Sequence, residues 1–493
     1  MHKFKDAHMN HSSNNAVAQT DTESINLESG HLSRLQLTSL AISSMIPAVG
    51  MASFPMLLVL NAGLGGWVAA LLAALTVICV GRAVTVFASR YVASGSLYSY
   101  AGEVFGRWAQ SLIAASLFLG YLAMVASILL VIGAYSGSFL QSIGIDGGLD
   151  RPAQIAIYLA SAAIVAAITC RGLDVSIVIA VLLTAICLPL LLAITGASAI
   201  HTGLHLQEQL TLQGASVSGI VAGIASGTAF LVGFEGSAAL AAETRDPKKN
   251  VPAAVMSVPI VLGTLYVIAT FLQAPGITET SDQILSGTSS PAALAENAGL
   301  PTAMGQMTDL VVAVATFAAL IGFVNYGSRF VATLSAEKLL PQRFTRIHSR
   351  FHSPVSAILL IILGGLFGIC TLVIGVTGPL PSIYNAVSTL VVYFWVSPYV
   401  VISIGAVMLL FRERAATAVT IAALIAGAVA TSWIYLNGIF FPAPSPVSAM
   451  SYVALATITP ATIAFYLMGR RSHADASQPP PHLNSERATA REQ

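Results

Sequence analysis

Charged residues are scarce in this sequence. Lys, Arg, Asp and Glu make up 9% of its 493 residues, whereas 56% are hydrophobic, and a soluble domain is about 25% charged. This number of charges is too small to cover a globular surface in water. Much of the chain must therefore face lipid. The formal net charge of +1 excludes the large basic field of a nucleic-acid-binding protein. We therefore predict a multi-pass membrane protein that has no nucleic-acid partner.

The sequence also lacks patterns that hold metals, nucleotides or catalytic groups. Its four cysteines, Cys79, Cys170, Cys187 and Cys370, lie in or beside apolar stretches without the paired spacing of a zinc or redox site. No histidine falls within a predicted span, and no glycine loop ends in Gly-Lys-Ser or Gly-Lys-Thr. No nucleophile and base form a recognisable constellation. We predict neither an enzyme nor a bound metal or cofactor, and no ATP-driven transport by this chain alone.

Long apolar runs dominate what is present. A helix that crosses a bilayer needs about 20 apolar residues. Such stretches lie near residues 36–62, 66–90, 110–140, 153–170, 173–199, 217–243, 253–274, 305–334, 354–376, 382–411, 415–438 and 448–469. With the N-terminus placed inside, only Arg151 of the 22 Lys and Arg falls in an outer loop. Arg82 lies within the second span, and the other 20 lie in inner loops, tails or the inner ends of spans. Because cytoplasmic loops retain basic residues, this predicts twelve spans with both termini cytoplasmic.

The segments outside the spans are polar. Residues 1–34 and 472–493 have the composition of disordered cytoplasmic tails. The outer loop near 275–304 carries acidic but no basic residues, and we expect a periplasmic or extracellular loop with room for a short helix. Asp309 follows this loop, and we expect its side chain to be solvated near the outer mouth.

Two spans contain residues that interrupt a helix. Pro47 and Gly50 lie in the first span, and Gly227, Gly233 and Gly236 punctuate the sixth. Unpaired backbone groups in lipid cost several kcal/mol each, so a break is tolerated where it lines a cavity or meets a ligand. A packing kink is the alternative for each break taken alone. Breaks that open two five-helix halves at matching places favour the binding site of a carrier.

The sequence around the sixth span resembles one family of carriers. Gly233-Phe234-Glu235, followed by the run from Glu243 to Val255 (ETRDPKKNVPAAV), is similar to the amino acid–polyamine–organocation (APC) permeases. More weakly, residues 95–100, 328–329 and 339–341 resemble other elements of that family. The resemblance covers about residues 36–470. It implies an all-α LeuT-type fold, with inverted repeats at 35–200 and 217–411 and two further helices at 415–470. Ala48-Val49-Gly50 stands where many members have Gly-Ser-Gly.

An α-amino acid needs donors for its carboxylate and acceptors for its ammonium group. We expect the broken first helix to offer N–H groups near Gly50, and the broken sixth helix to offer carbonyl groups near Phe230; the resemblance implies the same arrangement. Tyr121 and Phe230 either recognise the substrate side chain or pack between helices. The predicted substrate-binding residues are Ala48, Val49, Gly50, Met51, Ala52, Tyr121, Ala229, Phe230, Leu231 and Gly233.

A few polar side chains lie within the predicted spans. A carboxylate such as that of Glu235 has a high free-energy cost at membrane depth. Glu235 is either a proton carrier or a protonated structural residue that is hydrogen-bonded to the backbone freed by the break. Arg82 we expect to snorkel to the inner surface rather than to act as a gate. Asn325 and Ser328 lie where sodium-coupled relatives bind a cation, although such residues more often bond to neighbouring helices.

These observations predict a secondary active carrier of neutral or hydrophobic amino acids in the cytoplasmic membrane, driven by protons or by exchange. An amine or polyamine carrier is the nearest alternative, but a polycation needs several buried acids, and Glu235 is the only clear one at mid-membrane. A sodium-coupled symporter is another alternative. A non-transporting sensor on a permease scaffold is more remote, because no large cytoplasmic domain is evident. The sequence does not predict an oligomeric state.

Overall fold

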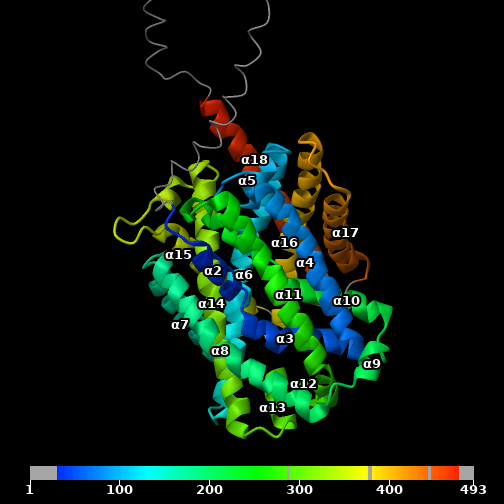
Figure 1. Cartoon of the computed structure of the whole chain (residues 1–493). Coiled ribbons are helices and arrows are strands. Elements are labelled where there is room, and N and C mark those ends of the chain that lie inside the picture. The colour runs from blue at the N-terminus through cyan, green and yellow to red at the C-terminus, as the bar shows by residue number, and fades with distance from the viewer. Residues whose placement is uncertain (1–29, 286–287, 376–379, 442–445, 477–493) are drawn as a thin grey trace, which may run out of the picture.

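The protein is a bundle of long helices in the computed structural model (Figure 1), which describes residues 30–285, 288–375, 380–441 and 446–476. Within these residues, eleven helical stretches are long and apolar enough to cross a membrane. The first stretch runs for 55 residues, from Arg34 to Ala88. It comprises α2 (Arg34–Ser44), α3 (Pro47–Ala62), the 3₁₀ turn η1 (Gly63–Gly65) and α4 (Gly66–Ala88).

The remaining long helices coincide with the apolar stretches of the sequence. They are α6 (Arg107–Ser142), α7 (Arg151–Thr169), α8 (Leu173–Thr202), α10 (Val217–Ala229) with the 3₁₀ helix η2 (Phe234–Glu243), α11 (Pro247–Glu279), α14 (Thr302–Ala336), α15 (Val355–Gly375), α16 (Leu380–Arg412), α17 (Ala418–Phe440) and α18 (Met450–Ala476). Because α8 ends beyond its predicted span, it includes His201 in its last turn.

Short elements connect these helices at the two ends of the bundle. They are α5 (Leu97–Gly102), α9 (Leu206–Leu210), α12 (Ser281–Leu285), α13 (Ser290–Asn297), η3 (Gln342–Thr345) and η4 (Val447–Ala449). In Figure 1, α5 and the C-terminal end of α18 lie at the top, and α9, α12 and α13 lie at the bottom. The outer loop predicted near 275–304 therefore contains the end of α11 and two short helices.

The centre of the bundle is formed by α6 and α14, which are the most buried of the long helices, whereas α17 and α18 are the least buried. Large apolar side chains are exposed on the outer faces of the peripheral helices, for example Phe367 on α15 and Val429 on α17. An apolar outer surface of this kind suits a lipid environment and would be a liability in water.

The ends of the expected polar tails are part of the fold where the structure describes them. Leu32 is fully buried and pairs with the backbone around Thr244, with its N–H donating to the carbonyl of Glu243 at 2.9 Å. At the other end, α18 continues to Ala476, into the predicted C-terminal tail. The rest of both tails, residues 1–29 and 477–493, lies outside the described residues.

Candidate functional site

The first span is interrupted at Met45 and Ile46, between α2 and α3. Ile46 has a φ of 50°, in the left-handed region that a β-branched residue rarely adopts. Tyrosines from other helices support this conformation. Tyr266 of α11 donates to the carbonyl of Met45 at 3.4 Å, and the hydroxyl of Tyr326 of α14 lies 3.1 Å from that of Ser44. The chain direction therefore changes at a fixed point, held by two neighbouring helices.

The unpaired backbone donors of this break lie one or two residues before Gly50. A helix leaves its first N–H groups without partners inside the helix. Pro47, at the first position of α3, has no N–H group, so these donors belong to Ala48 and Val49. The N–H of Gly50 already donates to the carbonyl of Ile46 at 3.0 Å. Met51 and Ala52 follow within the helix.

The sixth span is interrupted between α10, which ends at Ala229, and η2, which begins at Phe234. Gly233 has a φ of 84°, and its N–H donates to the hydroxyl of Tyr399 at 2.8 Å. The last bonds of the turn run from Phe230 to Gly227 and from Leu231 to Thr228. In the described part of the chain, no backbone N–H donates to the carbonyls of residues 229–231. These groups are the acceptors predicted for this span.

Both interruptions meet in one cavity of about 720 Å³. Its walls come largely from α3, α6, α10, α16 and α17, and residues at both breaks are part of its lining. Of the predicted substrate-binding residues, Val49, Gly50, Ala229 and Phe230 line it.

The other predicted residues lie behind the cavity wall, in the protein core. They are Ala48, Met51, Ala52, Tyr121, Leu231 and Gly233. The first five belong to buried apolar clusters, and Gly233 provides the positive φ at the break. Tyr121 packs against Phe330 and Trp395, with ring centroids at 5.6 and 5.4 Å, which is the helix-packing alternative for this residue.

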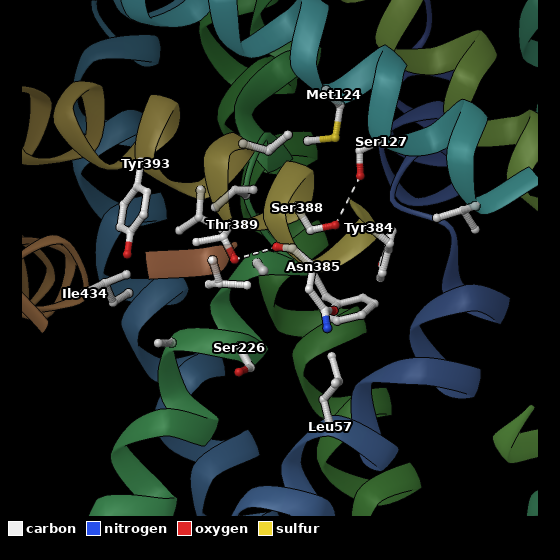
Figure 2. Close-up of a pocket in the computed structure, with 18 of the residues that line it drawn as sticks. Leu57, Met124, Ser127, Ser226, Tyr384, Asn385, Ser388, Thr389, Tyr393 and Ile434 are labelled. Atoms are coloured by element: carbon white, nitrogen blue, oxygen red, sulfur yellow. Dashed lines mark hydrogen bonds between the residues drawn. The ribbon is translucent and has the colours of Figure 1, made fainter. Parts of the chain in front are cut away.

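No Asp, Glu, Lys, Arg or His lines the cavity among the described residues. Its polar groups are hydroxyls, amides and backbone atoms, and α16 contributes several of them. Figure 2 shows Ser388 of α16 facing Ser127 of α6, with their hydroxyl oxygens 3.2 Å apart. The amide of Asn385 points into the space between α16 and Leu57 of α3. Within the described chain, this amide has no side-chain partner, so it is available to a ligand.

Glu235 lies just beyond the sixth-span break and outside the cavity wall. Its side chain is 1% exposed. Trp395 Nε1–H donates to Oε1 at 2.7 Å, and the Tyr399 hydroxyl donates to Oε2 at 2.6 Å. The same Tyr399 hydroxyl accepts from the N–H of Gly233. Glu235 thus fastens the start of η2 to α16, and both its oxygens are already hydrogen-bonded.

At the other end of η2, Glu243 forms a buried ion pair with Arg329 of α14. The guanidinium donates from Nε to Oε2 at 3.1 Å and from Nη2 to Oε1 at 3.2 Å, and the two side chains are 2% and 1% exposed. Its Nη1 donates to Asn325 Oδ1 at 3.0 Å and to the hydroxyl of Ser328 at 3.4 Å. The positive guanidinium beside these two oxygens disfavours a bound cation there.

Asp309 is not solvated as the sequence suggested. It is 4% exposed and accepts hydrogen bonds from the hydroxyls of Ser138 on α6 and Ser289 beside α13. Its partners lie 171 and 20 residues away in sequence. Arg82, in contrast, is exposed on α4 and lines a second, smaller cavity instead of the one at the breaks.

The sequence interpretation overlooked α16 as a wall of the site. Asn385, Ser388 and Thr389 lie three and four residues apart, which places them on one face of a helix. A polar face of this kind in an apolar span was the available signal. Trp395 and Tyr399 were also missed, because aromatic residues are common in membrane helices and nothing in the sequence links them to Glu235.

A family model described as amino acid permease matches residues 32–465 of this chain. Among proteins with curated descriptions, none matches the chain.

Proposed function

Because the chain belongs to the amino acid permease family, a family of transporters and not of enzymes, we propose that this multi-pass membrane protein is a secondary active carrier of neutral amino acids in the cell membrane. The observation that carries the proposal is the single cavity that joins the two interrupted spans and has an uncharged lining. Donors at the start of α3 and acceptors at the end of α10 suit the carboxylate and the ammonium group of an amino acid.

The proposed architecture has twelve crossings. A 55-residue stretch would be about 80 Å long as one helix, against a hydrocarbon core of about 30 Å. In Figure 1, α4 runs back toward α5 after η1, which supports two crossings for Arg34–Ala88. Breaks in the first and sixth spans support inverted repeats of five helices each. The distribution of basic residues supports cytoplasmic termini.

With that orientation, the cavity is open to the outside. Its lining includes Asn61 at the end of α3, Phe441 after α17, and Ser448 in η4. These residues lie at the ends of helices opposite the basic, cytoplasmic end. Transport by alternating access then requires this opening to close and the cytoplasmic side, where the buried Glu243–Arg329 pair joins η2 to α14, to open.

The uncharged lining favours a substrate whose side chain carries no net charge. A charged side chain would leave water for a cavity without a counter-ion, and burial of an unpaired charge is costly. Hydroxyl and amide groups along α16 instead suit apolar or uncharged polar side chains. The same observation disfavours the polyamine alternative, since no carboxylate of the described chain lines the cavity.

Counterflow in proteoliposomes tests this function directly. We expect the reconstituted protein to exchange external labelled neutral amino acids for internal ones. Lysine, glutamate and spermidine should exchange at least about tenfold more slowly, since each 1.4 kcal/mol of uncompensated desolvation is worth a factor of ten. Exchange should also persist when choline replaces sodium. Faster exchange of spermidine than of any neutral amino acid would instead establish the polyamine carrier.

We propose protons or exchange as the driving force, with Glu235 as the proton-binding residue. The Glu235→Gln variant should lose the pH dependence of uptake, because its amide cannot take up and release a proton. Tyr399→Phe is the matched control, since it removes one hydrogen bond to Glu235 but keeps the carboxyl group. The measurement is initial uptake from pH 5 to pH 8 at equal amounts of inserted protein.

A purely structural Glu235 gives a different pattern. Glu235→Gln and Tyr399→Phe would then lower uptake by similar factors at every pH, because each leaves a buried donor or acceptor unsatisfied at a cost of about 1–3 kcal/mol. An unchanged pH profile in Glu235→Gln would show that this residue does not couple transport to protons.

A further inference from the structure

A second cavity, of about 270 Å³, lies where the C-terminal ends of α4 and α16 meet the start of α17. It belongs to the end of the bundle where the predicted cytoplasmic basic residues gather. Unlike the central cavity, it has cationic side chains in its lining, together with hydroxyl groups. The residues that matter here are Arg82, Thr85, Ser89, Arg90, Thr417 and Thr420.

Arg82 is the unexplained feature of this region. It lies seven residues after Leu75 and eleven after Leu71, which places all three on one exposed face of α4. Leu71 and Leu75 are 39% and 45% exposed, as expected for a lipid-facing surface. In the described chain, the Arg82 side chain has no hydrogen bond or ion pair. A guanidinium at such a position is costly unless it reaches water or a counter-ion.

In contrast to Arg82, the side chain of Arg90 is held by hydrogen bonds and an ion pair. Nε donates to Glu413 Oε2 at 2.7 Å, and Nη1 donates to the carbonyl of Val86 at 2.7 Å. Glu413 is therefore committed to Arg90 and leaves the positive charge of Arg82 uncompensated.

The start of α17 adds groups suited to an anion. Thr417 caps the helix, and its hydroxyl donates to Thr420 Oγ1 at 2.9 Å. The Thr420 hydroxyl can therefore donate its own proton into the cavity. The N-terminal end of a helix also favours a negative charge.

Helix packing fixes the depth of this cavity. α17 closely approaches α4 at Gly427, where a Cβ atom would lie 3.2 Å from the backbone of Cys79 and Val80. Two residues beyond Val80 on α4, the cavity begins with Arg82. The close contact between α17 and α4 thus borders the cavity on the side of the membrane centre, and the cavity starts on the lipid-facing stripe of α4.

We propose that this cavity binds a phosphate group at the cytoplasmic surface, supplied by a phospholipid headgroup or by free phosphate. Arg82 forms the main charge contact, since a guanidinium matches the geometry of phosphate oxygens, and Thr420 donates a further hydrogen bond. The position of Arg82 at the end of a lipid-facing stripe allows acyl chains to lie along Leu75 and Leu71. Basic pockets between membrane helices suit such headgroups.

The test is ligand-dependent thermal stability of the purified full-length protein in detergent. Phosphatidylglycerol, phosphatidylcholine and inorganic phosphate are titrated separately against the wild type and against Arg82→Gln, Arg82→Lys and Arg171→Gln. Arg171 is the matched control, because it is an exposed arginine of the predicted cytoplasmic side that does not line the cavity. The readout is the ligand concentration that gives half of the maximal stabilisation.

We expect this concentration to rise at least about tenfold in Arg82→Gln, to rise less in Arg82→Lys, and to stay unchanged in Arg171→Gln. Protection by a phospholipid but not by inorganic phosphate identifies a headgroup as the ligand, and the reverse identifies free phosphate. If no phosphate compound stabilises the wild type, or if Arg82→Gln lowers the melting temperature equally with and without ligand, the site does not exist.

Discussion

Replacement of Gly50 by valine is expected to lower uptake strongly. A Cβ atom at this position would lie 2.1 Å from the Cζ and hydroxyl oxygen of Tyr266. Tyr266 is fully buried and donates to the carbonyl of Met45 at the first-span break. Its ring cannot yield without moving the break itself. Overpacking of a buried site costs about 1–3 kcal/mol, so uptake should fall by about five- to 150-fold. The measurement is counterflow at equal membrane insertion.

The matched control is Gly368→Val. Gly368 lies within the membrane helix α15, and a Cβ atom there meets no other atom within 4 Å, so this variant should transport at the wild-type rate. Full transport by Gly50→Val would show that the cavity beside α3 is not the substrate path.

The sequence contains a signal for the exact position of the first break that the prediction did not use, namely Pro47. Proline disfavours the helical conformation in the residue before it, and it is well tolerated at the first position of a helix. The break therefore falls immediately before Pro47, at Ile46, and α3 begins with Pro47. Placing the free donors near Gly50 located the break at the glycine instead. Gly50 is required by the close approach of Tyr266 and not by its backbone conformation.

Disruption of the buried ion pair should have the largest effect on stability. Arg329→Gln leaves the carboxylate of Glu243 buried and without its charged partner, and breaking one side of such a pair costs about 3–5 kcal/mol. We expect a large drop in the melting temperature of the purified protein and in the amount that inserts. The double variant Arg329→Gln/Glu243→Gln should recover much of the loss, because neither side chain then carries a charge.

Arg346→Gln serves as the control for that series, since Arg346 is an exposed arginine of the same predicted cytoplasmic side. It should leave the melting temperature unchanged. If Arg329→Gln were as stable as the wild type, the ion pair between Arg329 and Glu243 would not contribute to the stability of the protein.

The helices could be predicted from the sequence, but their mutual contacts could not. Apolar length and the distribution of basic residues locate each span, because both properties are local. Arg329 pairs with Glu243 across 86 residues, and the rule that places basic residues at the cytoplasmic side does not distinguish a buried arginine from an exposed one. Asp309 was misinterpreted for the same reason, because Ser138 comes from a different helix.

The 3₁₀ winding of η2 has a mechanical consequence. Its ten residues span about 20 Å at a rise of about 2.0 Å each, but only about 15 Å in an α-helix. Rewinding it would shorten the segment by about one helical pitch and swing one end round its axis by roughly half a revolution. Glu235 and Glu243, anchored to α16 and α14, could not both keep their partners. The bonds of the two glutamates therefore hold η2 in its longer 3₁₀ form. Loss of the partners of either glutamate would allow η2 to shorten.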